Sequence, residues 1–153
     1  MRILLTGFMG AGKTSVGRRL AANLGWPFID LDEEIEKLAG ESVREIFEHV
    51  GEGRFREVEA RVLAESMRPD PVVVATGGGT LNPEFATLTR RVGGRGKEDR
   101  PLFRDEATVL PLYRERLPAY ALADLKVDVA PGESVEEVAA RIGLLVAERT
   151  CST

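Results

Sequence analysis

The feature that most constrains this chain is the segment Gly7–Thr14, which has the sequence G-F-M-G-A-G-K-T. It matches G-x-x-x-x-G-K-[ST], the phosphate-binding P-loop. An apolar run at residues 2–6 precedes it, and apolar residues follow four apart at Val16, Leu20 and Leu24. These flanks predict a buried strand before the loop and an amphipathic helix after it. The motif therefore has the strand–loop–helix context that phosphate binding requires.

Each residue type in this loop has a physical role in binding phosphate groups. Glycines allow the backbone to turn its N–H groups inward, and the N-terminus of the following helix favours negative charge. Lys13 supplies a positive charge for the β- and γ-phosphates, and Thr14 supplies a hydroxyl ligand for Mg²⁺. The loop predicts a nucleotide site with Mg²⁺, and a chance glycine-rich turn is the alternative.

Size and composition restrict the class of protein. The 153 residues suffice for one domain with a real core, and the net charge of −4 argues against nucleic acid as the main partner. The single cysteine, Cys151, excludes a disulfide within the chain and fits a reducing cytosol. Met1 leads directly into the first expected strand, which predicts no signal peptide, and no apolar run reaches the ~20 residues of a membrane span. We therefore expect a cytoplasmic protein without a membrane partner.

Two carboxylates, Asp30 and Asp32, end the second expected strand at residues 27–31. In open α/β sheets, ligands bind at the carboxyl ends of the strands, where the P-loop also lies. The pair is therefore predicted to bind a ligand or a metal ion. The alternative is that one aspartate, with Asp32 well placed, caps the helix that follows at residues 33–38.

Two further patterns predict ligand contacts. Arg56 and Glu59 lie three residues apart on an expected helix at residues 54–67 and so share a face, although a surface ion pair is the usual outcome. Three glycines follow a third buried strand at residues 72–76. They predict close approach of the backbone to a ligand, with a flexible loop as the alternative.

The remaining patterns complete an α/β protein. Capping boxes begin helices at Ser42 and Ser134, and a further strand is expected at residues 125–129. His49, the only histidine, is expected on the surface. The basic, glycine-rich stretch at residues 90–100 suits a lid that closes an arginine over phosphates, with a solvated loop as the alternative.

Together these motifs resemble those of the shikimate kinases, and the resemblance runs along almost the whole chain. The P-loop alone specifies little beyond phosphate binding, whereas the combination in this order is highly specific. The matching segments are Gly7-x4-Gly12-Lys13-Thr14, Phe28-x-Asp30-x-Asp32, Gly53-x-Phe55-Arg56-x-x-Glu59, Gly77-Gly78-Gly79, Arg100-Pro101-Leu102 and Arg116-x-Pro118-x-Tyr120. The family transfers the γ-phosphate of ATP, with Mg²⁺, to the 3-hydroxyl of shikimate in the chorismate pathway of aromatic amino-acid biosynthesis. Family analogy favours a monomer.

The resemblance implies a role for each matching residue. Asp32 would bind the hydroxyls of shikimate and is the candidate base, and Mg²⁺ would be held by Thr14 and, through water, by Asp30. Lys13 and Arg100 would act on the transferring phosphate, and Arg91 would stack on adenine. The phosphates of ATP would be wrapped by Gly10, Ala11, Gly12, Lys13, Thr14 and Ser15. Arg56 and Arg116 would clamp the carboxylate of shikimate, with backbone contributed by Gly78 and Gly79. The other predicted substrate-binding residues are Glu59 and Gly77.

The implied fold is a three-layer α/β P-loop kinase domain spanning residues 1–153, with a lid at about residues 91–104. Helices would flank a central parallel sheet of strand order 2-3-1-4-5. One departure is serious, because no apolar run for the fourth strand follows Gly79. About 15 residues, a strand and the start of its helix, are missing near Ala86-Thr87. That strand would lie beside the P-loop strand, so its loss would leave an unpaired edge and a void.

Three explanations of this departure remain open. The residues are missing from the sequence as determined, the last strand has moved inward after a true deletion, or the chain is an impaired relative. A domain stable by only ~5–15 kcal/mol could hardly lose a central strand, which favours the first explanation.

Two rival functions follow from the same residues. One is another small P-loop kinase that acts on gluconate or a nucleoside monophosphate, although Arg56, Arg116 and the three glycines favour a small carboxylated polyol as substrate. The other is a nucleotide-binding protein without catalysis, which the missing strand motivates.

Overall fold

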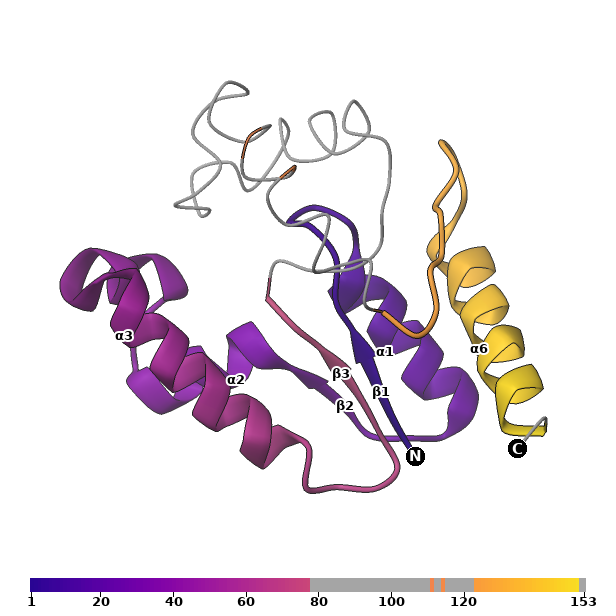
Figure 1. Cartoon of the computed structure of the whole chain (residues 1–153), viewed down its shortest axis with the longest axis horizontal. Helices are drawn as coiled ribbons and strands as arrows, with labels where there is room; N and C mark the ends of the chain where they lie inside the picture. Colours follow the sequence, from indigo (N-terminus) through magenta and orange to yellow (C-terminus); the bar gives the residue numbers. More distant parts are fainter. Residues whose placement is uncertain (78–110, 112–113, 115–122, 152–153) are drawn as a thin grey trace.

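A parallel sheet separates two pairs of helices in the computed structural model, which describes residues 1–77, 111, 114 and 123–151 (Figure 1). Helices α2 and α3 contact each other on one side of the sheet, and α1 and α6 contact each other on the other side. The elements are β1 (Arg2–Leu5), α1 (Lys13–Leu24), β2 (Phe28–Asp30), α2 (Leu31–Ala39), α3 (Val43–Ser66), β3 (Val72–Ala75) and α6 (Val135–Cys151).

The three described strands lie in the order β1-β3-β2, and both pairings are parallel. Arg2 pairs with Val72 at one end of the β1–β3 ladder, and Asp30 pairs with Ala75 at the end of the β2–β3 ladder. The carboxyl ends of all three strands therefore meet at one edge of the sheet. This arrangement confirms the 2-3-1 part of the expected strand order.

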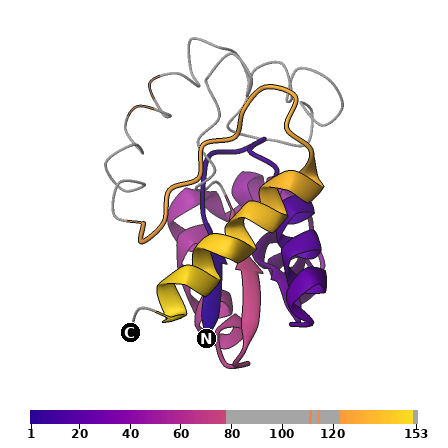
Figure 2. The same ribbon diagram turned by 90° about the vertical axis from the view of Figure 1, so that its right-hand side faces the viewer.

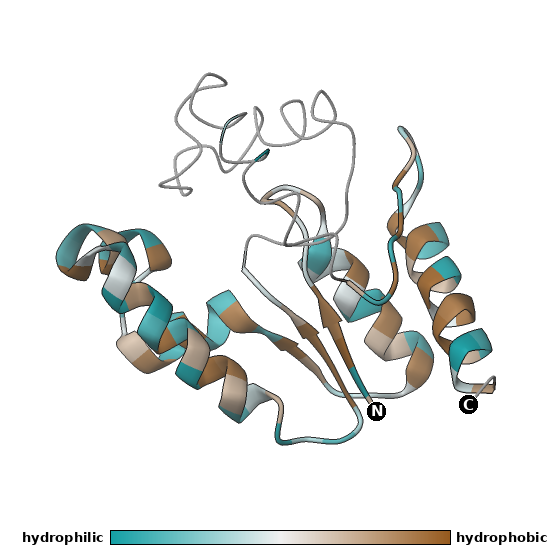
Figure 3. Cartoon of the chain, in the orientation of Figure 1, coloured by the Kyte–Doolittle hydropathy of each residue, from teal (hydrophilic) through white to brown (hydrophobic). Residues whose placement is uncertain are grey.

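Two hydrophobic clusters hold the layers together. The larger one joins the sheet to α1 and α6 through Leu5, Leu20, Val73, Val138 and Ile142. The smaller one fills the space around α2 and α3 and is formed by Leu31, Ile35, Ile46, Phe55 and Val62. Figure 2 shows α6 crossing the face of the sheet, and Figure 3 shows that the strands between the helices are hydrophobic. The sequence predicts apolar stripes at Phe55, Val58, Val62 and Leu63 and at Val138, Ile142, Leu145 and Val146. Both stripes are confirmed, because these side chains belong to the two clusters or pack against them.

Local signals at the helix ends gave mostly correct boundaries. The capping box of Ser42 and Glu45 is present, and Ser134 forms the same reciprocal hydrogen bonds with Glu137. The expectation that Asp32 is well placed as a helix cap is wrong. Asp30 is the N-cap residue of α2, and its carboxylate accepts a hydrogen bond from the Asp32 backbone N–H at 3.1 Å. The cap lies earlier because α2 begins at Leu31, directly after β2.

The glycines in Gly51-Glu52-Gly53 predict a break between the helix that begins at Ser42 and the helix at residues 54–67. The structure confirms this break, because two helical segments, together labelled α3, meet at a kink where Gly51 has a non-helical φ of 76° and ψ of 170°. Phe47 and Phe55 stack across this kink with ring centroids 4.4 Å apart. Their contact explains why the two parts remain joined. His49 lies on the surface as expected and pairs with Glu41 at 3.0 Å.

The expected strand at residues 125–129 is wrong. These residues form no strand and are drawn as a plain orange tube in Figure 2. Val127 and Val129 are nevertheless buried in the larger cluster. A strand needs a neighbour for its backbone hydrogen bonds, and within the described residues β1 pairs with β3 alone. The segment therefore contributes side chains to the core without joining the sheet. This finding contradicts the explanation in which the last strand moves inward to pair with β1.

Candidate active site

The P-loop connects β1 to α1 at the carboxyl edge of the sheet, as the sequence predicted. Gly10 and Gly12 have positive φ values of 81° and 92°, which L side chains rarely adopt. Gly12 is the N-cap residue of α1 and has no side chain to bind the first helical N–H groups. Those N–H groups and the helix dipole are therefore directed toward any anion that enters the loop.

Side chains of the loop itself fix its position. Phe8 and Ala11 are fully buried, and Met9 is nearly so, in the cluster that also contains Val127 and Val129. The sequence interpretation considered only the glycines, Lys13 and Thr14 and missed these anchors. Their signal was available, because all three residues between the glycines are apolar although the loop lies at the edge of the sheet. The loop is held by packing and does not depend on a ligand for its position.

The polar side chains of the loop already have partners. The Lys13 ammonium group donates hydrogen bonds to the carbonyl oxygens of Gly7 at 3.1 Å and Phe8 at 3.3 Å. The Thr14 hydroxyl donates to Asp30 Oδ2 at 2.6 Å. Asp30 is 8% exposed and also accepts from the Asp32 N–H group, so its orientation is fixed. Thr14 and Asp30, predicted separately as Mg²⁺ ligands, are thus brought together.

Asp32 lies in the first turn of α2, between the P-loop and α3. Its burial raises its pKa to about 6, and the nearby Asp30 carboxylate contributes in the same direction. Lys13 opposes this rise, whereas Glu59 and Glu36 add to it. A carboxyl group with a pKa near 6 is ionised at neutral pH and still accepts a proton readily. This environment suits a general base.

Glu59 of α3 lies close enough to Asp32 to affect its pKa, and Arg56 is the ion-pair partner of Glu59. Arg56 pairs with Glu59 at 2.8 Å and with Glu52 at 3.1 Å. Partial burial lowers the pKa of Arg56, but the hydrogen bonds and ion pairs with both glutamates leave it above its usual value. The ion pair of the alternative expectation is therefore present and is half-buried, since the Arg56 side chain is 40% exposed and that of Glu59 is 17% exposed.

Gly77 follows the end of β3 and lies against the carboxylates of Asp32 and Glu59. A Cβ atom at this position would lie 2.7 Å from Asp32 Oδ1 and 3.2 Å from Glu59 Oε1. A side chain there would force the Asp32 carboxylate to shift and would crowd that of Glu59, so close approach favours glycine at this position. The contact is with the protein's own carboxylates, whereas the sequence predicted approach to a ligand.

Several predicted site residues lie outside the described residues. They are Gly78, Gly79, Arg91, Arg100 and Arg116, together with the lid at about residues 91–104 and the gap near Ala86-Thr87. Their roles remain predictions. The described part of the chain holds no cluster of three or more His, Cys, Asp or Glu side chains that could bind a metal ion. No helix among the described residues is sufficiently long and apolar to cross a membrane.

Comparison with known proteins gives a consistent result. A family model described as shikimate kinase matches residues 9–86. A shikimate kinase of Bradyrhizobium diazoefficiens is 43% identical, and the alignment covers 88% of this chain and 76% of that protein. A shikimate kinase of Ruegeria pomeroyi is 41% identical, with 96% of this chain and 85% of the relative covered.

Solved structures agree with the sequence comparisons. A shikimate kinase from Acinetobacter baumannii in complex with shikimate superimposes with a TM-score of 0.88 at 33% identity, covering 97% of this chain and 93% of that one. A shikimate kinase from Aquifex aeolicus gives a TM-score of 0.83 at 32% identity and covers both chains completely. These values support the P-loop kinase fold implied by the resemblance.

The same comparisons bear on the missing strand. The alignment with the Ruegeria protein has 169 positions, whereas 96% of the 153 residues is about 147, so about 22 positions have no counterpart in this chain. The family match ends at residue 86, where the sequence predicted the gap. The alignment therefore contains more unmatched positions than the roughly 15 that the sequence predicted, and the family match ends where that gap was predicted. With identities near 40% over most of its length, the chain belongs to the shikimate kinase family.

Proposed function

We propose that this chain transfers the γ-phosphate of ATP to the 3-hydroxyl of shikimate and forms shikimate 3-phosphate and ADP. The observation that carries the proposal is the position of Asp32. Its pKa responds to Lys13 of the P-loop and to Glu59 of α3, so this carboxylate lies between the phosphate-binding loop and the Arg56–Glu59 pair. A cytoplasmic monomer remains our expectation.

The P-loop side of the site would bind the nucleotide. Lys13 would exchange its bonds to the Gly7 and Phe8 carbonyl oxygens for bonds to phosphate oxygens, because a charge-assisted hydrogen bond is stronger than one to a neutral carbonyl. The N–H groups that follow Gly12 would bind further phosphate oxygens. Arg91 and Arg100 would complete this side at adenine and at the transferring phosphate.

The donor set near Thr14 fits a magnesium ion. Mg²⁺ prefers oxygen ligands, retains several waters and needs few protein groups, and the Thr14 hydroxyl and an Asp30 oxygen lie 2.6 Å apart. When bound, Mg²⁺ would neutralise charge on the phosphate oxygens. Asp30 holds Thr14 and caps α2, so it ties the nucleotide side of the site to the substrate side.

Asp32 would accept the proton of the 3-hydroxyl. As that oxygen forms its bond to the γ-phosphorus, the bond from the phosphorus to the bridging oxygen of ADP breaks, and the hydroxyl proton passes to the Asp32 carboxylate. Phosphoryl transfer depends mainly on positioning and charge stabilisation. Lys13 and Arg100 would supply the charge, and Asp32 would orient the hydroxyl and take its proton.

Arg56 would bind the carboxylate of shikimate. A guanidinium group presents a planar fork of donors that matches a carboxylate. Glu59 and Glu52 hold the Arg56 fork in place before substrate arrives. Arg116 and the backbone of Gly78 and Gly79 would complete the carboxylate site.

The proposal is tested by comparing acceptors. Purified protein with ATP and Mg²⁺ receives shikimate, gluconate or cytidylate, and ADP formation is measured. We expect shikimate to support a rate at least about 100-fold above the other acceptors, because a site built for specific polar groups rejects substrates that lack them. The phosphorylated position is assigned by NMR spectroscopy. ATP binding without ADP formation would support the non-catalytic alternative, for which the missing segment is the specific observation.

A matched pair of variants tests the carboxylate site. Arg56→Ala should weaken shikimate binding at least about 30-fold and ATP binding less than about 2-fold, since loss of one partner of a buried charge pair typically costs ~2–5 kcal/mol. Arg54→Ala is the control, because Arg54 lies on the same helix, is exposed, and forms an ion pair with the exposed Glu57. Equal losses for shikimate and ATP in Arg56→Ala would contradict the assignment.

A further inference from the structure

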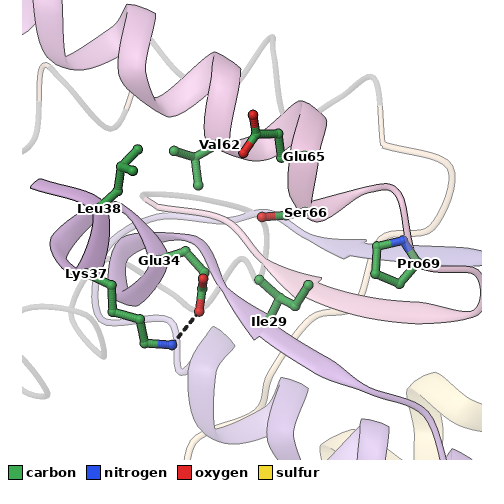
Figure 4. A pocket seen from close by; sticks show the side chains of 8 residues that line it. All are labelled: Ile29, Glu34, Lys37, Leu38, Val62, Glu65, Ser66 and Pro69. Atoms are coloured by element: carbon green, nitrogen blue, oxygen red, sulfur yellow. Dashed lines mark hydrogen bonds and ion pairs between the residues drawn. The ribbon is translucent and has the colours of Figure 1, made fainter.

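A pocket of about 410 Å³ lies away from the P-loop, between strand β2 and helices α2 and α3 (Figure 4). Ile29 of β2 forms its floor, and Val62 of α3 and Leu38 of α2 form apolar walls. Pro69 closes one end after α3. This volume lies within the range of small-molecule sites, which are typically ~300–1,000 Å³.

The Ser66 hydroxyl is the most informative polar group in this pocket. Ser66 is only 7% exposed as a whole residue, and it lines the pocket. Figure 4 shows the hydroxyl oxygen in the middle of the lining residues, between Val62 and Ile29. Because no buried side-chain oxygen or nitrogen among the described residues lacks a partner, this hydroxyl oxygen is open to the pocket and can bond to water or to a bound molecule. The pocket therefore presents an unused hydrogen-bonding group.

Charge at the rim restricts what that molecule can be. Glu34 pairs with Lys37, which neutralises both side chains. Glu65 also lines the pocket and has no ion pair among the described residues, so the rim carries one uncompensated negative charge. Leu38 is 58% exposed beside these charges, an apolar surface that the chain itself leaves uncovered. A complementary ligand has an apolar body and a positively charged donor.

We propose that this pocket is a second binding site, for a small apolar molecule that carries an ammonium group. The apolar body contacts Ile29, Val62 and Leu38, and the ammonium group donates to the Glu65 carboxylate and the Ser66 hydroxyl. The site is separate from the candidate active site, although α2 and α3 contribute to both. The proposal does not depend on the assigned phosphoryl transfer.

The test uses benzylamine as the probe and benzyl alcohol as its uncharged counterpart. ¹⁵N-labelled full-length protein is titrated with each compound at pH 7, and amide shifts are followed by NMR. We expect saturable shifts with benzylamine at Ile29, Lys37 and Ser66, and a Kd on the order of 1–10 mM, as suits a ligand of this size. Benzyl alcohol should bind at least about 5-fold more weakly. Equal binding of the two compounds, or no saturation by benzylamine, would overturn the proposal.

Variants locate the interaction. Glu65→Gln should weaken benzylamine binding about 5- to 10-fold, because hydrogen bonds to a charged group are among the stronger ones. Glu57→Gln removes the same charge from an exposed position on α3 and should change binding less than about 2-fold. Leu38→Ser removes an apolar wall at an exposed position and should weaken binding about 3-fold, and Ser66→Ala should have a similar effect. Equal effects of Glu65→Gln and Glu57→Gln would show that benzylamine senses only general surface charge.

Discussion

Strands β1 and β3 are neighbours in one parallel ladder, yet they differ in burial. Every residue of β3 is at most 1% exposed, whereas Leu4 of β1 is 38% exposed although it pairs with the fully buried Val74. Both strands consist mainly of aliphatic residues. The difference therefore does not arise from their composition. β3 has a strand on each side, and within the described residues β1 has a strand on one side only.

The contrast shows that pairing with one neighbouring strand does not by itself bury a strand. The other side of the strand must be covered as well. In the relatives, about 22 aligned positions have no counterpart in this chain, and the expected order places the fourth strand beside β1. Val127 and Val129 cover part of the open side from a segment that forms no strand. The half of the site formed by β2, β3 and α3 does not border this open side. We therefore expect the two halves to respond differently to substitution.

The largest expected effect is on kcat. It lies in the half of the site formed by β2, β3 and α3, which we call the closed half. Asp32→Asn should lower kcat about 10²- to 10⁴-fold, because it removes the proposed general base without changing the size of the side chain. Leu4→Ser, on the open side of β1, should change kcat less than about 2-fold. Both rates are measured as shikimate-dependent ADP formation. A large loss of kcat in Leu4→Ser would show that the open side of β1 controls the active site and would break the comparison.

Restoring the missing segment should have the next largest effect. The segment of the Ruegeria pomeroyi relative that has no counterpart here is inserted after Ala86. It should raise the free energy of unfolding by at least about 3 kcal/mol, the value of burying one or two further aliphatic side chains of β1 completely. Urea denaturation measures the gain, and hydrogen exchange should show slower exchange of the β1 amides.

A glycine–serine insertion of equal length is the control for this graft. It adds chain without a strand and should lower stability by less than about 1 kcal/mol, because the entropy of loop closure changes slowly with length. If the graft and the control have the same stability, the open side of β1 is not the place of the missing strand.

The sequence predicted the elements whose signals are local. The P-loop, the capping boxes at Ser42 and Ser134, and the apolar stripes of α3 and α6 each depend on residues within a few positions of one another. The pairing of Arg56 with Glu59 likewise follows from helical spacing. These features could be read without knowing the rest of the fold.

Features that depend on distant neighbours could not be predicted in this way. Residues 125–129 have the composition of a strand, but the missing neighbour decides that they form none. The close approach of Gly77 to the Asp32 and Glu59 carboxylates joins three separate elements, and no spacing encodes it. The position of the Ser66 hydroxyl in the pocket is similarly visible only once β2, α2 and α3 have been placed.

A third prediction tests the contrast in burial directly. Val74→Ala should cost about 2–3 kcal/mol of stability, because it leaves a cavity in a fully enclosed strand. Leu4→Ala removes more carbon atoms from the neighbouring position of the ladder but should cost only about 1 kcal/mol, since water already reaches that side chain. Chemical denaturation of both variants gives the two values. A larger cost for Leu4→Ala would mean that the open side of β1 is covered in solution.

The smallest expected effect is the pH dependence of stability that arises from the Asp32 carboxylate. The folded protein raises the pKa of Asp32 from 3.8 to about 6, so it binds this proton more tightly than the unfolded chain does. The corresponding stability is present below pH 4 and is lost as the pH rises through 6. The full shift corresponds to about 3 kcal/mol, and solvent near the partly open site reduces it to about 1–2 kcal/mol.

Asp32→Asn tests this pH dependence. The free energy of unfolding of the variant minus that of the wild type should be about 1–2 kcal/mol larger at pH 8 than at pH 4, as measured by urea denaturation. Titrating groups remote from Asp32 cancel in this comparison, and the difference reports Asp32 together with the charged groups that interact with it, Asp30, Lys13, Glu59 and Glu36. An unchanged difference between the two pH values would mean that Asp32 is solvated in both states, and that the half of the sheet around β2 is as open as the side of β1.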